Sequence, residues 1–238
     1  MRANLKVWVP VYSVVIAAIV ATGLIVAGGP TGVDTAVMGA VTGERTAWLT
    51  PLVSLLTEFF SPAVVPVWAL CVAGVLLARD RRVQRAAAVL ASVVVAAVVA
   101  EVIKVVITRP RPPAIDQLGA YESTLSYPSG HVTGTAALLI SVALVGTVTS
   151  RRATRAMAVV AALAVTAVVA WTRLYLGVHW LTDVSAGLLI GAATAALVVA
   201  VSPQLVATVG VRILDHLPPR AASWLEPPRS TGSRSLGA

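Results

Sequence analysis

Residues 86–107 read AAAVLASVVVAAVVAEVIKVVI, and this stretch of 22 residues decides the fold of the chain. A helix that crosses the hydrocarbon core of a bilayer needs about 20 consecutive, mostly apolar residues. The stretch supplies that length directly after Arg85, and its only charged residues, Glu101 and Lys104, come near its end. The sequence therefore predicts a transmembrane helix here, with two ionisable side chains close to one membrane face.

Five further intervals, each with at most one charged residue, have a similar composition. Together with the first interval they predict an all-α, polytopic membrane protein with six transmembrane helices. The first interval is longer than the apolar core of a signal peptide, which has about 7–15 residues, so we expect it to be retained as a span. The approximate bounds of the five intervals are 7–27, 62–78, 130–149, 156–171 and 181–201.

The overall composition indicates the same class of protein. Hydrophobic residues make up 58% of the chain and charged residues only 12%, whereas ordinary soluble domains have about 25% charged residues. This composition argues against a single soluble globule and excludes a disordered chain. Cys71 is the only cysteine, so the chain has neither an intramolecular disulfide nor a cysteine metal cluster.

The formal net charge of +8 is distributed unevenly along the chain. Thirteen of the 18 Lys and Arg residues lie at the N-terminus, after the second span, after the fourth span or after the sixth span. Cytoplasmic segments collect Lys and Arg, so we expect both termini to be cytoplasmic and the loops at about 28–61, 108–129 and 172–180 to face outward. The charge is thus explained by orientation, and no nucleic-acid partner is expected.

We expect a membrane domain over residues 1–203 and a cytoplasmic segment over 204–238. In the outer loop 28–61, apolar spacing predicts interfacial helices near 35–40 and 46–60. After Pro203, residues 204–217 are predicted to form an amphipathic surface helix, followed by a Pro-, Arg-, Ser- and Gly-rich disordered tail that begins at 218. The acidic residues of the outer loop are interpreted as solvated helix caps: Asp34, Glu44 and Glu58.

Five cations occur on the predicted outer side, against the charge bias: Arg45, Lys104, Arg109, Arg111 and Arg173. By the predicted topology, the segments at 104–112, 128–131 and 172–183 meet at that same face. Ionisable groups at the ends of membrane spans are costly and therefore mark functional sites. Cations together with a Ser-Gly helix start indicate an anion pocket, because the first amides of a helix point at a bound oxyanion. Phosphate is the natural ligand.

Two histidines supply the chemistry for cleaving a phosphate ester, which needs a nucleophile and a proton donor. His179 and Asp183 are spaced i and i+4 and share one helix face, so the carboxylate can hold one ring nitrogen and leave the other nucleophilic. His131 has no carboxylate at the same offsets, and we therefore expect it to be the acid.

The ordered motifs resemble the three-part signature of the type 2 phosphatidic acid phosphatase superfamily. They comprise Lys104 with Arg111-Pro112, the run Pro128-Ser129-Gly130-His131, and Arg173 with His179 and Asp183. The resemblance implies a metal-independent phosphatase without a cofactor, in which His179 forms a phosphohistidine, Asp183 orients it and His131 protonates the leaving group. It also implies that the phosphoryl oxygens are bound by Lys104, Arg111, Ser129, Gly130 and Arg173.

Three details of the motifs remain open. Thr172 stands where the family usually has serine, and the hydroxyl is kept. Arg109 duplicates the arginine-proline pair and has no assigned role, since the spacing from Lys104 favours Arg111. Glu101 lies one turn before Lys104 and is interpreted as its ion-pair partner. The aromatic residues beside the third motif are interpreted as an interfacial belt: Trp171, Tyr175 and Trp180.

The expected function is hydrolysis of a lipid phosphate or diphosphate at the outer face of a bacterial cytoplasmic membrane. The compact chain favours a polyprenyl (undecaprenyl) diphosphate substrate. Phosphatidate and phosphatidylglycerol phosphate are alternatives, as are a lipid phosphotransferase and a non-enzymatic lipid transporter on the same fold. The sequence gives no indication of oligomeric state.

Overall fold

The computed structural model describes residues 5–80, 83–119, 122 and 124–214. These residues form eight α-helices and one short 3₁₀ helix, and the described ranges contain no strand, as the all-α prediction requires. The α-helices are α1 (Leu5–Val26), α2 (Gly32–Gly43), α3 (Leu49–Phe59), α4 (Val65–Asp80), α5 (Val83–Ile107), α6 (Gly130–Gly146), α7 (Arg152–Tyr175) and α8 (Leu181–Leu214). The 3₁₀ helix is Ala114–Asp116.

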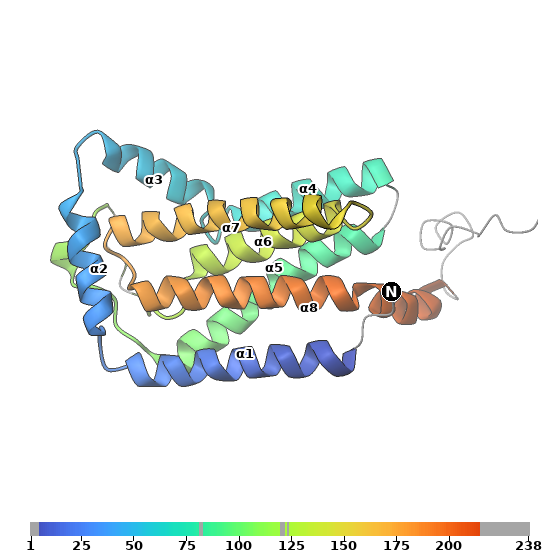
Figure 1. Ribbon diagram of the computed structural model, residues 1–238, viewed down its shortest axis with the longest axis horizontal. Helices are drawn as coiled ribbons and strands as arrows, with labels where there is room; N and C mark the ends of the chain where they lie inside the picture. The colour runs from blue at the N-terminus through green and yellow to red at the C-terminus, as the bar shows by residue number, and fades with distance from the viewer. Residues whose placement is uncertain (1–4, 81–82, 120–121, 123, 215–238) are drawn as a thin grey trace, which may run out of the picture.

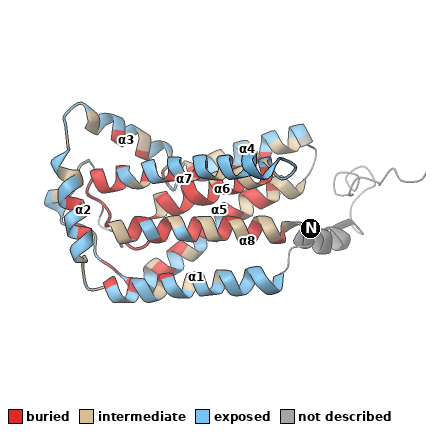
Figure 2. Cartoon of the chain, in the orientation of Figure 1, coloured by how far each residue is buried: buried red, intermediate tan, exposed pale blue. Residues whose placement is uncertain are grey.

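Six of the helices, α1 and α4 to α8, run along the length of a bundle, and α2 and α3 lie at one end of it (Figure 1). Helix α6 is central, because it packs against α5, α7 and α8. Helix α5 crosses the bundle from α4 towards α1 (Figure 1). The most buried residues therefore lie on α6 and on the faces of its neighbours (Figure 2).

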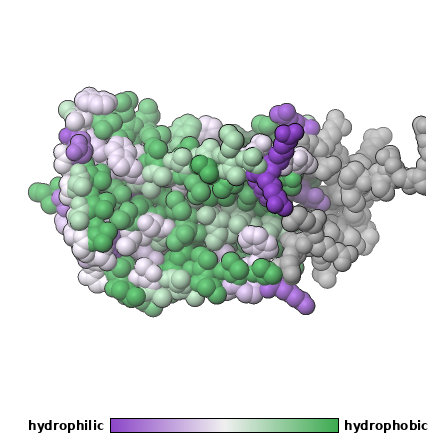
Figure 3. Space-filling view, in the orientation of Figure 1, coloured by the Kyte–Doolittle hydropathy of each residue, from purple (hydrophilic) through white to green (hydrophobic). Residues whose placement is uncertain are grey.

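The outer surface of the bundle is apolar. Val14 is 68% exposed and Ile25 is 84% exposed, although both belong to a helix of mean hydropathy 2.4. Hydrophobic side chains cover the flanks in the space-filling view, and the strongest hydrophilic patch lies at the end near the N-terminus (Figure 3). An apolar surface of this extent is expected of a protein whose solvent is lipid.

Four helices within the described residues are long and apolar enough to cross a membrane: α1, α5, α7 and the part of α8 from Leu181 to Ser202. The other two predicted spans correspond to α4 and α6, which are apolar but have only 16 and 17 residues. The chain is therefore a multi-pass membrane protein, and the six-span count and the orientation stay predictions. Two helices are present where the outer loop was expected to form them, α2 and α3, and their position at the membrane interface stays a prediction.

The boundary expected at Pro203 falls inside a continuous helix. Pro203 lacks an N–H group, so the carbonyl of Val199 loses its usual helical donor. The hydroxyl of Ser202 donates to that carbonyl at 3.1 Å, which replaces the missing bond. Helix α8 runs on to Leu214, so residues 204–214 extend α8 instead of starting a separate helix. Residues 215–238, which include His216 and the predicted tail, lie outside the described residues.

Two glycines on α8 bring it into direct contact with α6. A Cβ atom on Gly191 would lie 2.5 Å from the carbonyl oxygen of Thr133, and one on Gly187 would lie 2.7 Å from that of Ser129. The pair is spaced as G-x-x-x-G, a pattern that lets membrane helices approach closely. The contact sets the start of α6 beside the start of α8.

We predict that Gly191→Ala destabilises the bundle, because the added methyl group meets backbone atoms of α6. Overpacking of this kind costs about 1–3 kcal/mol, which thermal unfolding in detergent measures as a lower Tm. Gly74→Ala on α4 is the matched control, since a Cβ there meets nothing within 4 Å. Equal Tm values for the two variants would contradict the close α6–α8 contact.

Candidate active site

Three segments that are distant in sequence meet at the end of the bundle where α2 lies (Figure 1). The amide of Ser129, which precedes α6, donates to the carbonyl of Asp183 on α8 at 3.1 Å. Arg111, from the loop after α5, donates to the carbonyl of Val178, in the loop before α8, at 2.8 Å. The convergence predicted from the topology is therefore observed.

His179 and Asp183 lie together at the start of α8, and both side chains are buried. Nδ1 of His179 is 3.4 Å from Oδ2 of Asp183. The same carboxylate oxygen accepts hydrogen bonds from Ser126 Oγ (2.5 Å) and from the amide of Trp180 (2.8 Å). The predicted i, i+4 arrangement is present, and Ser126 is a partner that the sequence did not indicate.

The second nitrogen of His179 faces a cation. Nη1 of Arg111 donates to Nε2 of His179 at 3.0 Å. Arginine is only a donor, so Nε2 carries a lone pair and the ring proton is on Nδ1, towards Asp183. Burial, and next Arg111 and Arg173, lower the pKa of His179 well below its ordinary value of 6.5. The imidazole is therefore neutral near pH 7, and the lone pair of Nε2 accepts the hydrogen bond from Arg111.

Two arginines beside His179 are bridged by one acidic side chain. Glu122 Oε2 lies 2.9 Å from Arg111 Nη1, and Glu122 Oε1 accepts a hydrogen bond from Arg173 Nη2. Nη1 of Arg173 also donates to Thr57 Oγ1 on α3 at 3.0 Å. Burial would raise the pKa of Glu122, but Arg173 and Arg111 lower it below its usual value. Glu122 is thus an anion held between two cations.

Three buried polar atoms at this end of the bundle have no hydrogen-bond partner among the described residues: Ser129 Oγ, Arg173 Nε and Arg109 Nε. Ser129 is the N-cap of α6, and its side chain does not cap the helix. The first amides of α6 therefore lie at the same helix end as a hydroxyl without a partner. Buried polar groups are nearly always paired, so this arrangement fits an absent oxyanion.

Lys104 and His131 complete the cluster. Nζ of Lys104 is 2.6 Å from Glu101 Oε1, which is the expected ion pair. Lys104, Arg111, Arg173 and His179 all interact electrostatically with His131. The eight site residues predicted from the sequence thus gather at one end of the bundle, although their individual roles remain hypotheses. No group of three or more His, Cys, Asp or Glu side chains suited to a metal occurs among the described residues.

Two interpretations of residues near the site need correction. Asp34 does cap α2, through the capping box with Thr31, but its side chain is fully buried and pairs with Arg109 at 2.8 Å. Tyr175 and Trp180 are also buried and do not form an interfacial belt, which Trp171, at 36% exposed, can still join. The indole of Trp180 donates to the carbonyl of Pro110 at 3.2 Å. Glu44 and Glu58 are exposed, as expected.

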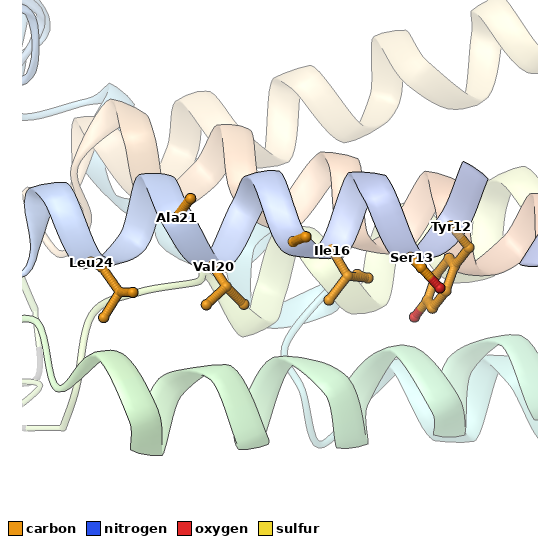
Figure 4. Close-up of a pocket in the computed structure, with 7 residues that line it drawn as sticks. Tyr12, Ser13, Ile16, Val20, Ala21 and Leu24 are labelled. Atoms are coloured by element: carbon orange, nitrogen blue, oxygen red, sulfur yellow. The ribbon is translucent and has the colours of Figure 1, made fainter. Parts of the chain in front are cut away.

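The flank of the bundle carries open apolar grooves. One groove of about 520 Å³ runs along α1, where Tyr12, Ile16 and Val20 lie on one side of the helix (Figure 4). A second cavity of about 280 Å³ between α1 and α8 is lined by Ile19 and Leu189 and ends at Tyr127 and Thr182, the residue before Asp183. The grooves are lined mainly by side chains that suit a hydrocarbon chain.

Comparisons with known proteins concern the fold and its family. The model of the PAP2 superfamily matches residues 85–207, which is more than half of the chain. A comparison with curated protein sequences gives no match. Among solved structures, the chain resembles a transmembrane PAP2 type phosphatidylglycerolphosphate phosphatase from Bacillus subtilis, with a TM-score of 0.66 and 22% identity over 86% of this chain and 98% of that one. It also resembles Aquifex aeolicus LpxE, with a TM-score of 0.56 and 18% identity over 71% of this chain and 95% of that one.

We predict that Glu122→Gln tightens the binding of inorganic phosphate. The carboxylate occupies both arginines and repels an incoming anion, and a gain of about 1 kcal/mol corresponds to roughly 5-fold in affinity. Isothermal titration of the detergent-solubilised protein with phosphate measures the change. Glu44→Gln is the control, because it removes an exposed carboxylate at the same end of the molecule. Weaker phosphate binding by Glu122→Gln would show that Glu122 is needed to hold the arginines in place.

Proposed function

The chain belongs to the PAP2 superfamily, and on that premise we propose that it is an integral-membrane lipid phosphatase that acts through a phosphohistidine. The observation that carries this proposal is the state of His179. Its Nδ1 faces Asp183, and its Nε2 presents a lone pair beside Arg111. A buried, neutral and oriented imidazole next to cations is a nucleophile suited to an anionic phosphorus centre.

The reaction proceeds in two steps. Nε2 of His179 attacks the terminal phosphorus, the bond from that phosphorus to the ester oxygen (or, in a diphosphate, to the bridging oxygen) breaks, and His131 gives a proton to the leaving oxygen. Water then attacks the phosphohistidine, the P–N bond breaks, and His131 accepts the proton of the water. Asp183 holds the ring and stabilises the positive charge that develops on it during the attack.

The cations around His179 stabilise the transition state. In the substrate complex Arg111 turns from Nε2 to a phosphoryl oxygen, and Arg173 and Lys104 bind the other non-bridging oxygens with Ser129 Oγ and the amide of Gly130. Fixed donors that are aimed at developing charge usually make the largest contribution to catalysis. These cations neutralise the phosphate, so the proposed mechanism requires no metal ion.

The membrane arrangement fits a lipid substrate. We propose six spans with both termini cytoplasmic, so that the site opens at the outer face of a bacterial cytoplasmic membrane. The cavity between α1 and α8 ends at Tyr127 and Thr182, beside the site, and offers room for part of an acyl or prenyl chain. A headgroup then reaches His179 while its chain stays among apolar side chains.

The proposed substrate is a polyprenyl diphosphate such as undecaprenyl diphosphate. Phosphatidylglycerol phosphate is the second candidate, because one structural neighbour carries that activity in its name, and phosphatidate is a third. A lipid phosphotransferase would transfer the phosphoryl group to an acceptor hydroxyl instead of water. A non-enzymatic lipid transporter on the same fold would release no phosphate.

We predict that His179→Ala abolishes phosphate release from these lipids. The assay uses purified protein in detergent with a chelator and a panel of the three lipids, and it separates the substrates by rate. His216→Ala is the matched control, since His216 lies outside the three motifs. Substantial turnover by His179→Ala would refute the nucleophile assignment, and strict dependence on added metal would refute the proposed mechanism.

We also predict a characteristic pH dependence. The neutral imidazole is the nucleophile, and the pKa of His179 is lowered well below 6.5, so kcat/KM should stay level as the pH falls through 6.5 and decline only below it. Arg111→Gln removes a nearby positive charge and raises the pKa of His179. Its acidic limb should therefore move up by about one pH unit. If the acidic limb of the kcat/KM profile lay at the same pH in the wild type and in Arg111→Gln, ionisation of His179 would not control that limb.

A further inference from the structure

We propose that Arg109 is a positioning residue, which fixes the Asp183 carboxylate so that its Oδ2 faces His179 and which ties this alignment to the docking of α2. The inference rests on the proposed function, because it concerns the same nucleophile. Arg109 lies outside the phosphate cradle. Within the described part of the chain it forms no hydrogen bond or ion pair with His179, Arg111 or Glu122, so it acts through Asp183.

The guanidinium of Arg109 joins three segments of the chain. Nη1 donates to Asp183 Oδ1 at 2.5 Å and to Thr182 Oγ1 at 2.6 Å, both at the start of α8. Nη2 donates to Asp34 Oδ2 at 2.8 Å, on α2, and to the carbonyl of Gly29 at 3.0 Å, in the α1–α2 connection. A planar fork with fixed donor directions can hold two carboxylates in one orientation.

The two oxygens of Asp183 have separate tasks. Oδ1 is bound by Arg109, whereas Oδ2 accepts from Ser126 and Trp180 and faces His179 Nδ1. Rotation of the carboxylate would break the contact with Arg109 and the contact with His179 together. Arg109 therefore determines which oxygen, and which lone pair, is presented to the nucleophile.

Asp34 anchors the other side of Arg109. Its Oδ1 accepts from the amide of Thr182 at 2.9 Å, and its Oδ2 accepts from the amide of Thr31 at 2.9 Å. One carboxylate thus caps the start of α2 and the start of α8 while it binds Arg109. Burial would raise the pKa of Asp34, but the amides of Thr31 and Thr182, and then Arg109, lower it. The Asp34 carboxylate therefore stays ionised and keeps its ion pair with Arg109.

The burial of this network argues for a specific role. The side chains of Arg109, Asp34 and Asp183 are all 0% exposed. Buried ion pairs give little net stability compared with well-packed apolar residues of the same size, and their best-attested use is to specify one arrangement. Here the specified arrangement includes the residue that orients the nucleophile.

The test measures kcat and KM of Arg109→Lys with a short-chain lipid phosphate in detergent. Lysine keeps the charge but has one ammonium group, which cannot reach α2 and Asp183 together. We expect kcat to fall about 10–100-fold, the range for losing a group that orients a functional side chain, with KM within about 2-fold. Asp34→Asn is the second variant and should also lower kcat. The asparagine NH₂ group would face the N–H donors that the Asp34 carboxylate now accepts from.

Arg45→Lys is the matched control. Arg45 also joins separate segments at the same end of the bundle, through the carbonyls of Tyr175 (2.8 Å) and Asp116 (2.7 Å), but it forms no hydrogen bond or ion pair with Asp183 in the described residues. Its kcat should stay within about 3-fold of the wild type. Equal losses in Arg45→Lys and Arg109→Lys would overturn the proposal, because they would reflect general loosening of the outer end.

A double-mutant cycle separates positioning from stability. In the background of Asp183→Asn, Arg109→Lys should change kcat by less than about 2-fold, since the orienting carboxylate is already lost. A full additional loss would overturn the proposal. The proposed function is tested separately by wild type and His179→Ala: an inactive wild type refutes that function, whereas an active wild type with unchanged kcat in Arg109→Lys and Asp34→Asn refutes only the role of Arg109.

Discussion

The Asp183 carboxylate is the group on which the site end of the bundle, where α2 lies, depends. A buried carboxylate is tolerated only when its oxygens are bound, and the donors that bind this one come from separate parts of the chain. Arg109 follows α5, Ser126 precedes α6, and Trp180 precedes α8. Satisfying one anion therefore fixes three connections relative to one another, and His179 is held among them.

The lipid environment explains where the charged side chains of the bundle lie. The flanks of the bundle expose apolar side chains, so ionisable groups gather at the ends, where they pair. The five cations at the site end differ in what they bind. Arg45 and Arg109 hold backbone and carboxylate groups of the fold, whereas Arg111 and Arg173 share Glu122, and Lys104 pairs with Glu101. The last three are the cations that we propose bind the phosphoryl oxygens of a substrate.

The sequence predicted the parts of the site that local spacing and topology determine. The offset between His179 and Asp183 gave their contact, and the alternation of spans brought three distant motifs to one end. The capping signal at Asp34 was also correct, but its burial depends on Arg109, 75 residues away, which no local pattern reveals. Ser126 and Glu122 belong to no expected motif, and the helix through Pro203 depends on a hydroxyl that replaces a lost backbone donor. Long-range pairing was therefore the part that the sequence could not supply.

The central claim is that the phosphoryl group passes through Nε2 of His179. Rapid quenching of the wild-type enzyme during turnover of a ³²P-labelled lipid phosphate, followed by mapping of the labelled peptide, tests it most directly. We expect an acid-labile label on His179 that forms and decays at rates compatible with kcat. A label on another residue, or full turnover with no labelled protein at any quench time, would contradict it.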